Sequence, residues 1–276
     1  MLENFIFENH LGLTFNGLEN GVYLNYNDLR DYKWDFDTIN GRISRFYKGV
    51  THRKLPLVVS CDSPEEAAVV LNRIHELAEA DIEAKKPGRV YIGEYYTVGY
   101  ITGSVKTDYL EADRVCKLDL TLTCENSAWY KERTEVFAKN SGESMDSESG
   151  LDYPYDYPFD YALLAQDRVI TLDSKGSSNF RLKIYGEAVN PSITIGGHTY
   201  AINGTVGNGA TLLIDSLAKT ITLTTAAGTT VNWFDKRDRW RYIFKPIPTG
   251  RHKIIWDGSF GFDLTYIEKR SEPKWT

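Results

Sequence analysis

The stretch that decides how this chain is organised is Leu151-Asp152-Tyr153-Pro154-Tyr155-Asp156-Tyr157-Pro158-Phe159-Asp160-Tyr161, two tandem copies of Tyr-Pro-aromatic-Asp followed by a tyrosine. Pro154 and Pro158 each lack a backbone donor and disfavour helical conformation in the residue before them, so we expect an extended segment. Alternate side chains of an extended segment share a face. One face therefore carries five aromatic rings, which we expect to dock on a neighbouring domain: Tyr153, Tyr155, Tyr157, Phe159 and Tyr161.

The residues just before this stretch, 140–150, are small, polar and acidic, a composition typical of a solvated connection. We therefore predict an N-terminal domain over residues 1–139, a linker over residues 140–161 and a C-terminal domain over residues 162–276. A chain of 276 residues is long enough for two domains that each bury a core.

Composition favours a β-rich protein, because the chain holds 18 tyrosines and 6 tryptophans at an ordinary 42% hydrophobic content. The charge is uneven. Residues 1–150 hold 17 Lys and Arg against 25 Asp and Glu, a net charge of −8, whereas residues 151–276 hold 15 against 13, a net charge of +2. A general nucleic-acid binder needs a concentrated basic surface, so this distribution argues against that class.

The clearest element of the N-terminal half is a helix that begins after Ser63. Ser63 is the expected N-cap, Pro64 suits the first helical position and Glu66 completes a capping box. The run from Lys85 to Gly88 is expected to end the helix. Apolar residues recur at helical spacing and predict a buried stripe: Ala67, Val70, Leu71, Ile74, Leu77 and Ala78.

Strands dominate the rest of the N-terminal half, so we predict an α+β domain with one helix. Two separate strands are expected over residues 95–104 and 105–109, followed by an alternating strand from Cys116 that ends near Tyr130. The three cysteines are Cys61, Cys116 and Cys124, an odd number without a C-x-x-C pair, and we expect them to be reduced.

The C-terminal half is predicted to be entirely β. About eight short strands are separated by turn signals, among them hairpin tips at Gly196-Gly197 and at Asp257-Gly258. This pattern predicts a β-sandwich or jelly roll.

No motif in the sequence predicts catalysis. The five histidines form no zinc-binding pattern, and the common nucleotide-binding and hydrolase motifs are missing. We therefore predict no enzymatic activity, no metal site and no cofactor.

One run offers a candidate binding site, since it mixes cations with tryptophans that could stack on sugars or bases: Trp233, Arg239 and Trp240. The alternative interpretation is a charged loop whose tryptophans anchor it to the sandwich. Both interpretations stay open on the sequence alone.

Three segments together resemble the distal tail (Dit) proteins of siphovirus-type phages, which have long non-contractile tails, and specifically those of prophages of Gram-positive bacteria. These segments are the tandem Tyr-Pro-aromatic-Asp stretch, the run from Trp240 to Gly250 and the run from Arg270 to Trp275. The resemblance covers the whole chain. It implies a mainly β, two-domain fold, with a ring-forming α+β split β-barrel flanked by one helix and then a galectin-like β-sandwich of jelly-roll type.

The same resemblance implies a structural virion protein. A hexameric ring at the distal end of the tail would join the tail tube to the tail tip or baseplate and leave a channel for DNA in transit. The implied partners are further copies of the chain, the tail tube protein, the tail-associated tip protein and receptor-binding proteins. The protein would be assembled in the host cytoplasm, without membrane insertion, and end in the tail tip of the virion.

Two alternatives belong to other functional classes. In the first, the C-terminal sandwich is a carbohydrate-binding adsorption module. In the second, the chain is a wall hydrolase, but the sequence offers neither a convergent acid pair nor a metal-ligand set for it.

Overall fold

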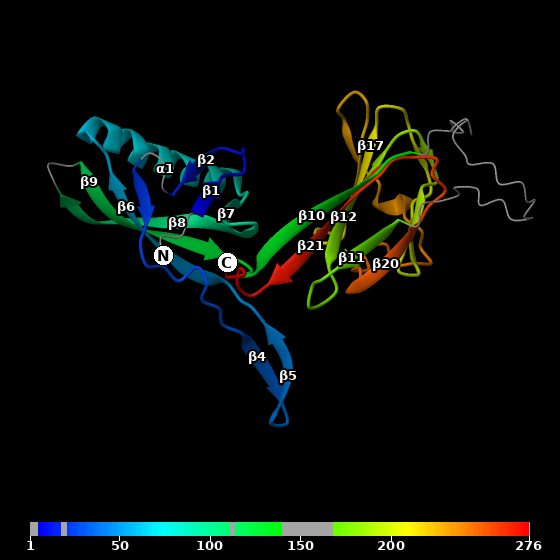
Figure 1. Cartoon of the computed structure of the whole chain (residues 1–276), viewed down its shortest axis with the longest axis horizontal. Helices are drawn as coiled ribbons and strands as arrows, with labels where there is room; N and C mark the ends of the chain where they lie inside the picture. Colours follow the sequence, from blue (N-terminus) through cyan, green and yellow to red (C-terminus); the bar gives the residue numbers. More distant parts are fainter. Residues whose placement is uncertain (1–4, 18–20, 111–113, 140–167, 276) are drawn as a thin grey trace, which may run out of the picture. The chain divides into compact units, whose positions relative to one another are not determined.

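The computed structural model describes residues 5–17, 21–110, 114–139 and 168–275. These residues form 21 strands and one α-helix, which confirms the prediction of a mainly β protein (Figure 1). The chain divides into two compact units. Unit 1 comprises Met1–Lys131 and Lys269–Thr276, and unit 2 comprises Glu132–Glu268. The predicted linker over residues 140–161 and its five aromatic side chains lie outside the described residues.

Unit 1 is organised around one long strand, β8 (Tyr95–Leu110). Its first half pairs with β7, which is followed by β1 and β2 in the same antiparallel sheet, and its second half pairs with β9, followed by β6 and β3. These strands are β1 (Phe5–Glu8), β2 (Thr14–Asn16), β3 (Val22–Leu24), β6 (Thr51–Ser60), β7 (Gly88–Ile92) and β9 (Val115–Cys124). Among the described residues these strands form one open sheet that does not close into a barrel, unlike the split β-barrel that the family resemblance implies.

The prediction of two separate strands over residues 95–109 was wrong. β8 continues through both predicted strands because two register shifts, between Ile101 and Gly103 and between Lys106 and Asp108, absorb the irregularities. The strand predicted to end near Tyr130 also differs: β9 ends at Cys124, and β10 (Trp129–Phe137) begins after a short loop.

Helix α1 (Pro64–Ala84) begins and ends as the sequence predicts. The Ser63 hydroxyl accepts the Glu66 N–H at 3.2 Å, and the Glu66 carboxylate accepts the Asp62 N–H at 3.3 Å. Lys85 adopts the left-handed conformation that terminates the helix. The helix packs on β6, β8, β9 and β2 (Figure 1). Its buried residues are Ala67, Ile74, Leu77, Ala78 and Asp81, whereas Val70 and Leu71 are half-buried.

The core of unit 1 gathers around Trp129, whose side chain is completely buried. Its Nε1–H donates to the Leu29 carbonyl at 3.3 Å. The buried Arg53 donates to the same carbonyl and, at 3.1 Å, to the Ser127 carbonyl. The alternation of β9 places every second side chain in this core: Cys116, Leu118, Leu120, Leu122 and Cys124. All three cysteines are free.

The last residues of the chain belong to unit 1. The Arg30 guanidinium lies 4.1 Å from the centroid of the Trp275 ring and donates to the Pro273 carbonyl at 3.1 Å. This cation–π contact and hydrogen bond attach the C-terminal segment to the N-terminal one.

Unit 2 is a sandwich of two antiparallel sheets around one core. The first sheet follows the order β19-β18-β17-β12-β21-β10, and the second follows β11-β20-β14-β15. The strands of the first sheet are β12 (Asn179–Tyr185), β17 (Thr211–Asp215), β18 (Thr220–Thr224), β19 (Thr230–Asn232) and β21 (Phe262–Arg270), with β10 from above. Those of the second are β11 (Val169–Leu172), β14 (Ser192–Ile195), β15 (His198–Ala201) and β20 (Gly250–Ile255). A short pair, β13 (Ala188–Val189) and β16 (Thr205–Val206), completes the unit.

The two predicted hairpins of unit 2 have different outcomes. β14 and β15 form the expected hairpin, and Gly196 and Gly197 at its tip both have positive φ, as a two-residue turn of this type requires. The hairpin predicted at Asp257-Gly258 was wrong. β20 pairs with β11 and β14, whereas β21 pairs with β12, so this turn connects strands of different sheets.

Candidate assembly interface and aromatic groove

A two-stranded hairpin in unit 1 has an apolar face that no other described element covers. Within the described ranges, strands β4 (Asp35–Ile39) and β5 (Arg42–Tyr47) pair only with each other (Figure 1). Asn40 and Gly41 form the tip with positive φ at both residues. Every residue of the two strands is exposed except Asp35, which is half-buried.

The strand register sorts the hairpin side chains into two faces, because directly paired residues share a face. Phe36 pairs with Phe46 and Thr38 with Ile43, so these four residues form an apolar face. The other face is mainly charged and comprises Asp35, Asp37, Ile39, Arg42, Arg45 and Tyr47.

The apolar face is well formed although it is exposed. The Phe36 and Phe46 rings contact edge to face with centroids 6.4 Å apart, and their side chains are 55% and 59% exposed. Ile43 is 53% exposed. A monomeric soluble protein gains nothing by leaving such a cluster in water, so this face is a candidate assembly interface.

At the base of the hairpin, Lys48 lies over the Trp34 ring at 4.9 Å and over the Tyr32 ring at 5.8 Å. Burial, together with the nearby charges of Arg53 and Lys269, lowers the pKa of Lys48 to about 8. The ammonium group is therefore partly desolvated where the hairpin leaves the core.

The sequence contained a signal for this hairpin that the sequence analysis did not use. Asn-Gly between two alternating runs is the strongest short-range indication of a two-residue hairpin, and Asn40-Gly41 lies between two such runs.

Unit 2 carries a groove of about 560 Å³ whose lining combines aromatic and cationic side chains. Phe244 is buried at its floor, Phe234 stacks on Phe244 with centroids 6.0 Å apart, and Tyr242 contacts Phe244 edge to face at 6.0 Å. The lining consists of Lys219, Phe234, Arg237, Asp238, Arg239, Trp240, Arg241, Tyr242, Ile243 and Phe244.

The structure brings together two of the three predicted binding residues. Arg239 and Trp240 both line the groove, and Trp240 is 96% exposed. Trp233 does not line it; the ring is half-buried and packs against the core of unit 2. The sequence analysis missed Phe234 and Tyr242, which lie next to the predicted residues in the chain.

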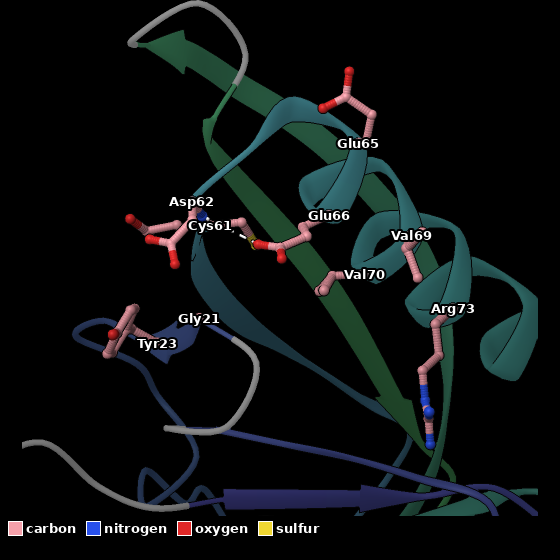
Figure 2. A pocket seen from close by; sticks show the side chains of 10 residues that line it. Gly21, Tyr23, Cys61, Asp62, Glu65, Glu66, Val69, Val70 and Arg73 are labelled. Carbon is pink, nitrogen blue, oxygen red and sulfur yellow. Dashed lines mark hydrogen bonds between the residues drawn. The ribbon is translucent and has the colours of Figure 1, made fainter.

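A hollow of about 700 Å³ lies between the start of α1 and β3, beside the half-buried Cys61. Figure 2 shows Cys61 and Glu66 next to each other, with Arg73 further along the helix. Burial, followed by the charges of Glu66 and Asp62, raises the pKa of the Cys61 thiol. The thiol is thus kept in its protonated, poorly nucleophilic form.

Within the part of the chain that the structure describes, no group of three or more His, Cys, Asp and Glu side chains could hold a metal ion. No helix of the described ranges is long and apolar enough to cross a membrane.

Comparison with known proteins gives a result at the level of structure. The chain matches no protein-family model and no curated protein sequence. It superposes on the crystal structure of the Dit protein of phage SPP1, which is described as a paradigm of the hub adsorption apparatus in phages that infect Gram-positive bacteria. The TM-score is 0.58 at 10% identity, over 96% of this chain and 99% of that one.

Two structures of the phage P2 baseplate in its activated conformation also contain a similar chain. The structure with Ca gives a TM-score of 0.62 at 14% identity, and the structure with Sr gives 0.62 at 15% identity. Both matches cover 99% of this chain and 100% of the other. Across nearly its whole length, this chain therefore has the fold of phage Dit and baseplate proteins.

Proposed function

We propose that this protein is a structural component of a phage tail, a ring subunit that joins the tail tube to the tail tip or baseplate. The whole-length similarity to Dit and baseplate chains supports the class of function. In the proposed assembly, six copies form a closed hexameric ring at the end of a long non-contractile tail. The ring is assembled in the host cytoplasm and then resides in the virion.

The observation that carries the proposal is the uncovered apolar face of the β4–β5 hairpin. A closed ring requires a heterologous contact, in which one surface of a subunit binds a different surface of the next. The hairpin is an amphipathic arm without a partner among the described residues of its own chain, so it can supply one side of such a contact. We assign a second copy of this chain as its occupant, and Phe36, Ile43 and Phe46 as the residues that it buries.

The acidic balance of residues 1–150 is compatible with a central channel for DNA. These residues carry a net charge of −8, from 17 Lys and Arg against 25 Asp and Glu. An acidic wall repels phosphate groups, so DNA in transit would not adhere to it. The tail tube protein, the tail-associated tip protein and receptor-binding proteins are the proposed partners of the ring. The proposed role requires no catalysis and no cofactor.

Light scattering combined with negative-stain imaging of the full chain tests the proposal, alone and with tail tube protein. We expect closed rings at high protein concentration. Phe36→Asp combined with Phe46→Asp should leave a folded monomer, because both rings are exposed in the single chain and the charges would then have to be buried between subunits.

Val189→Asp is the matched control. Val189 is an aliphatic residue that is 67% exposed, and it lies in unit 2 rather than on the hairpin. The Val189→Asp protein should assemble into closed oligomeric rings as the wild type does. Monomers at every concentration, with and without tube protein, would refute ring assembly. If the Phe36→Asp, Phe46→Asp double variant assembles into oligomeric rings as readily as the wild type, the assigned contact is refuted.

A further inference from the structure

The aromatic groove of unit 2 exposes a tryptophan on a segment that is firmly held. Trp240 is 96% exposed and Tyr242 is 58% exposed. The backbone around them is fixed, since the Asp238 N–H donates to the Ala201 carbonyl at 3.1 Å and His198 Nε2 lies 3.0 Å from the Tyr242 carbonyl. The exposure therefore belongs to the folded state, and not to a frayed loop.

Two further hydrogen bonds hold the same segment. The buried Tyr200 donates its hydroxyl to the Lys245 carbonyl at 2.7 Å, and burial raises the pKa of Tyr200, so that this donor keeps its proton. The Trp240 N–H donates to the Asp238 carboxylate at 2.9 Å. These bonds fix the backbone that carries the Trp240 side chain, so a ligand need not order this backbone when it binds.

The cations of the groove fall into two groups. Arg237 lies 3.9 Å from the Phe234 ring centroid, and Lys219 lies 5.5 Å from the Tyr242 and Phe244 centroids, so both are engaged with aromatic faces. Arg239 and Arg241, on either side of Trp240, are exposed and make no hydrogen bond or ion pair within the described part of the chain. The lining therefore holds four cationic side chains and one carboxylate, that of Asp238.

We propose that this groove binds an acidic saccharide, with one sugar ring stacked on Trp240 and its anionic group held by Arg239 and Arg241. An exposed indole offers a flat apolar surface that matches the C–H face of a sugar ring. Two guanidinium groups beside it supply paired donors for a carboxylate or phosphate. The volume of about 560 Å³ falls within the range of small-molecule sites, about 300–1,000 Å³.

Charge complementarity favours a short anionic ligand over a nucleic acid. Single-stranded nucleic acid also stacks on aromatic rings, but its binding needs a basic track along several phosphates. Residues 151–276 carry a net charge of only +2, from 15 Lys and Arg against 13 Asp and Glu, so the four cations of the groove form a local cluster.

Isothermal titration of the full chain tests the site, with trigalacturonate and glucose 6-phosphate as carboxylate and phosphate probes. Maltotriose serves as the neutral probe and a thymidine hexanucleotide as the nucleic acid. We expect saturable binding of at least one acidic sugar, which weakens as salt rises and quenches tryptophan fluorescence. Trp240→Ala should weaken it at least tenfold, and Arg239→Gln combined with Arg241→Gln should abolish the preference over maltotriose.

Two matched variants serve as controls. Arg251→Gln removes an exposed cation of unit 2 outside the groove, and Trp275→Ala removes a tryptophan of unit 1 that is 73% exposed. Both should bind like the wild type. All five substituted positions are exposed, and in Trp275→Ala the hydrogen bond from Arg30 to the Pro273 carbonyl remains, so circular dichroism should show unchanged folding.

The site is refuted if neither acidic sugar binds, or if Trp240→Ala binds as tightly as Trp275→Ala. Equal affinity for maltotriose, or tighter binding of the hexanucleotide, would refute the assigned ligand class. None of these outcomes depends on ring assembly, because the groove lies within unit 2 of each chain and the titration reports binding per chain whatever its oligomeric state.

Discussion

Helix α1 allows a graded test of how unit 1 is held together, because three of its aliphatic residues differ in burial. Leu77 is 5% exposed and belongs to the core, Leu71 is half-buried, and Val69 is 68% exposed. Replacing each with aspartate introduces the same charge into the same helix. Both Leu→Asp changes lose the same helix propensity, up to about 0.7 kcal/mol, so the difference between Leu77→Asp and Leu71→Asp reports the environment alone. Val69→Asp changes helix propensity very little, because Val and Asp have similar values.

The expected magnitudes follow from burial. Leu77→Asp loses about 2–3 kcal/mol of apolar burial and leaves an unpaired buried carboxyl that costs several kcal/mol more. The sum, about 5 kcal/mol or more, equals the whole stability of many domains. Leu71 lines a surface hollow of about 290 Å³, so its aspartate keeps access to water. We expect Leu71→Asp to cost about 1–2 kcal/mol, and Val69→Asp less than about 0.5 kcal/mol.

Thermal denaturation of the full chain, followed by circular dichroism at 222 nm, measures this order. The helical signal follows unit 1, because α1 is the single α-helix of the described residues. With about 3–5 °C per kcal/mol for a unit of this size, Leu71→Asp should lower the midpoint by about 3–10 °C. Leu77→Asp should abolish the cooperative helical transition. Equal midpoints for Leu77→Asp and Val69→Asp would refute the packing described for α1.

Two further predictions concern the core of unit 2 and the base of the hairpin. Phe137 is 5% exposed and stacks on Phe262 with ring centroids 4.6 Å apart. Phe137→Ala should therefore cost about 3–5 kcal/mol and lower the unfolding midpoint of unit 2. Val136 is 73% exposed, so Val136→Ala should leave the midpoint unchanged. Burial lowers the pKa of Lys48 from the ordinary 10.5 to about 8 in the folded protein. Between pH 8 and pH 10.5 the unfolded state therefore binds more protons than the folded state, and the free energy of unfolding should rise with pH over this range. Urea denaturation at about pH 7.5 and 10 should show this rise for the wild type relative to Lys48→Met, and a parallel response of the two proteins would contradict the burial of the ammonium group.

Local signals in the sequence were enough to predict α1 and much of unit 2. The helix has a cap, a stripe and a stop within 26 residues, 63–88, and the Gly196-Gly197 hairpin has its turn and both strands within ten, 192–201. Such elements are specified by neighbouring residues. The turn at Asp257-Gly258 has an equally strong local signal, yet its flanking strands pair elsewhere. Ile254 pairs with Ile195 and Phe262 with Ile184, both far away in the sequence.

Side-chain roles on the surface were harder to predict than burial. Arg73 lies on the exposed face of α1, where an alanine would normally be tolerated, but its guanidinium donates to the Thr14 carbonyl through Nε at 3.2 Å and through a terminal nitrogen at 2.8 Å. Trp233 and Trp240 have similar sequence surroundings, yet one packs on the core and the other is almost fully exposed. The role of Arg73 and the different burial of the two tryptophans both depend on contacts between distant segments, which the periodicity of the sequence does not reveal.

The division of the chain shows the same limit on a larger scale. A change in composition marks residues 140–161. Residues 132–139, upstream of that stretch, nevertheless belong to unit 2, and the chain from Lys269 onward, downstream of it, belongs to unit 1. Phe137 stacks on Phe262, and Arg30 binds the Trp275 ring, over sequence distances that no local pattern encodes. A cut within residues 140–161 therefore does not separate the units. The N-terminal fragment would keep a core strand of unit 2, and the C-terminal fragment would keep the tail that packs on unit 1.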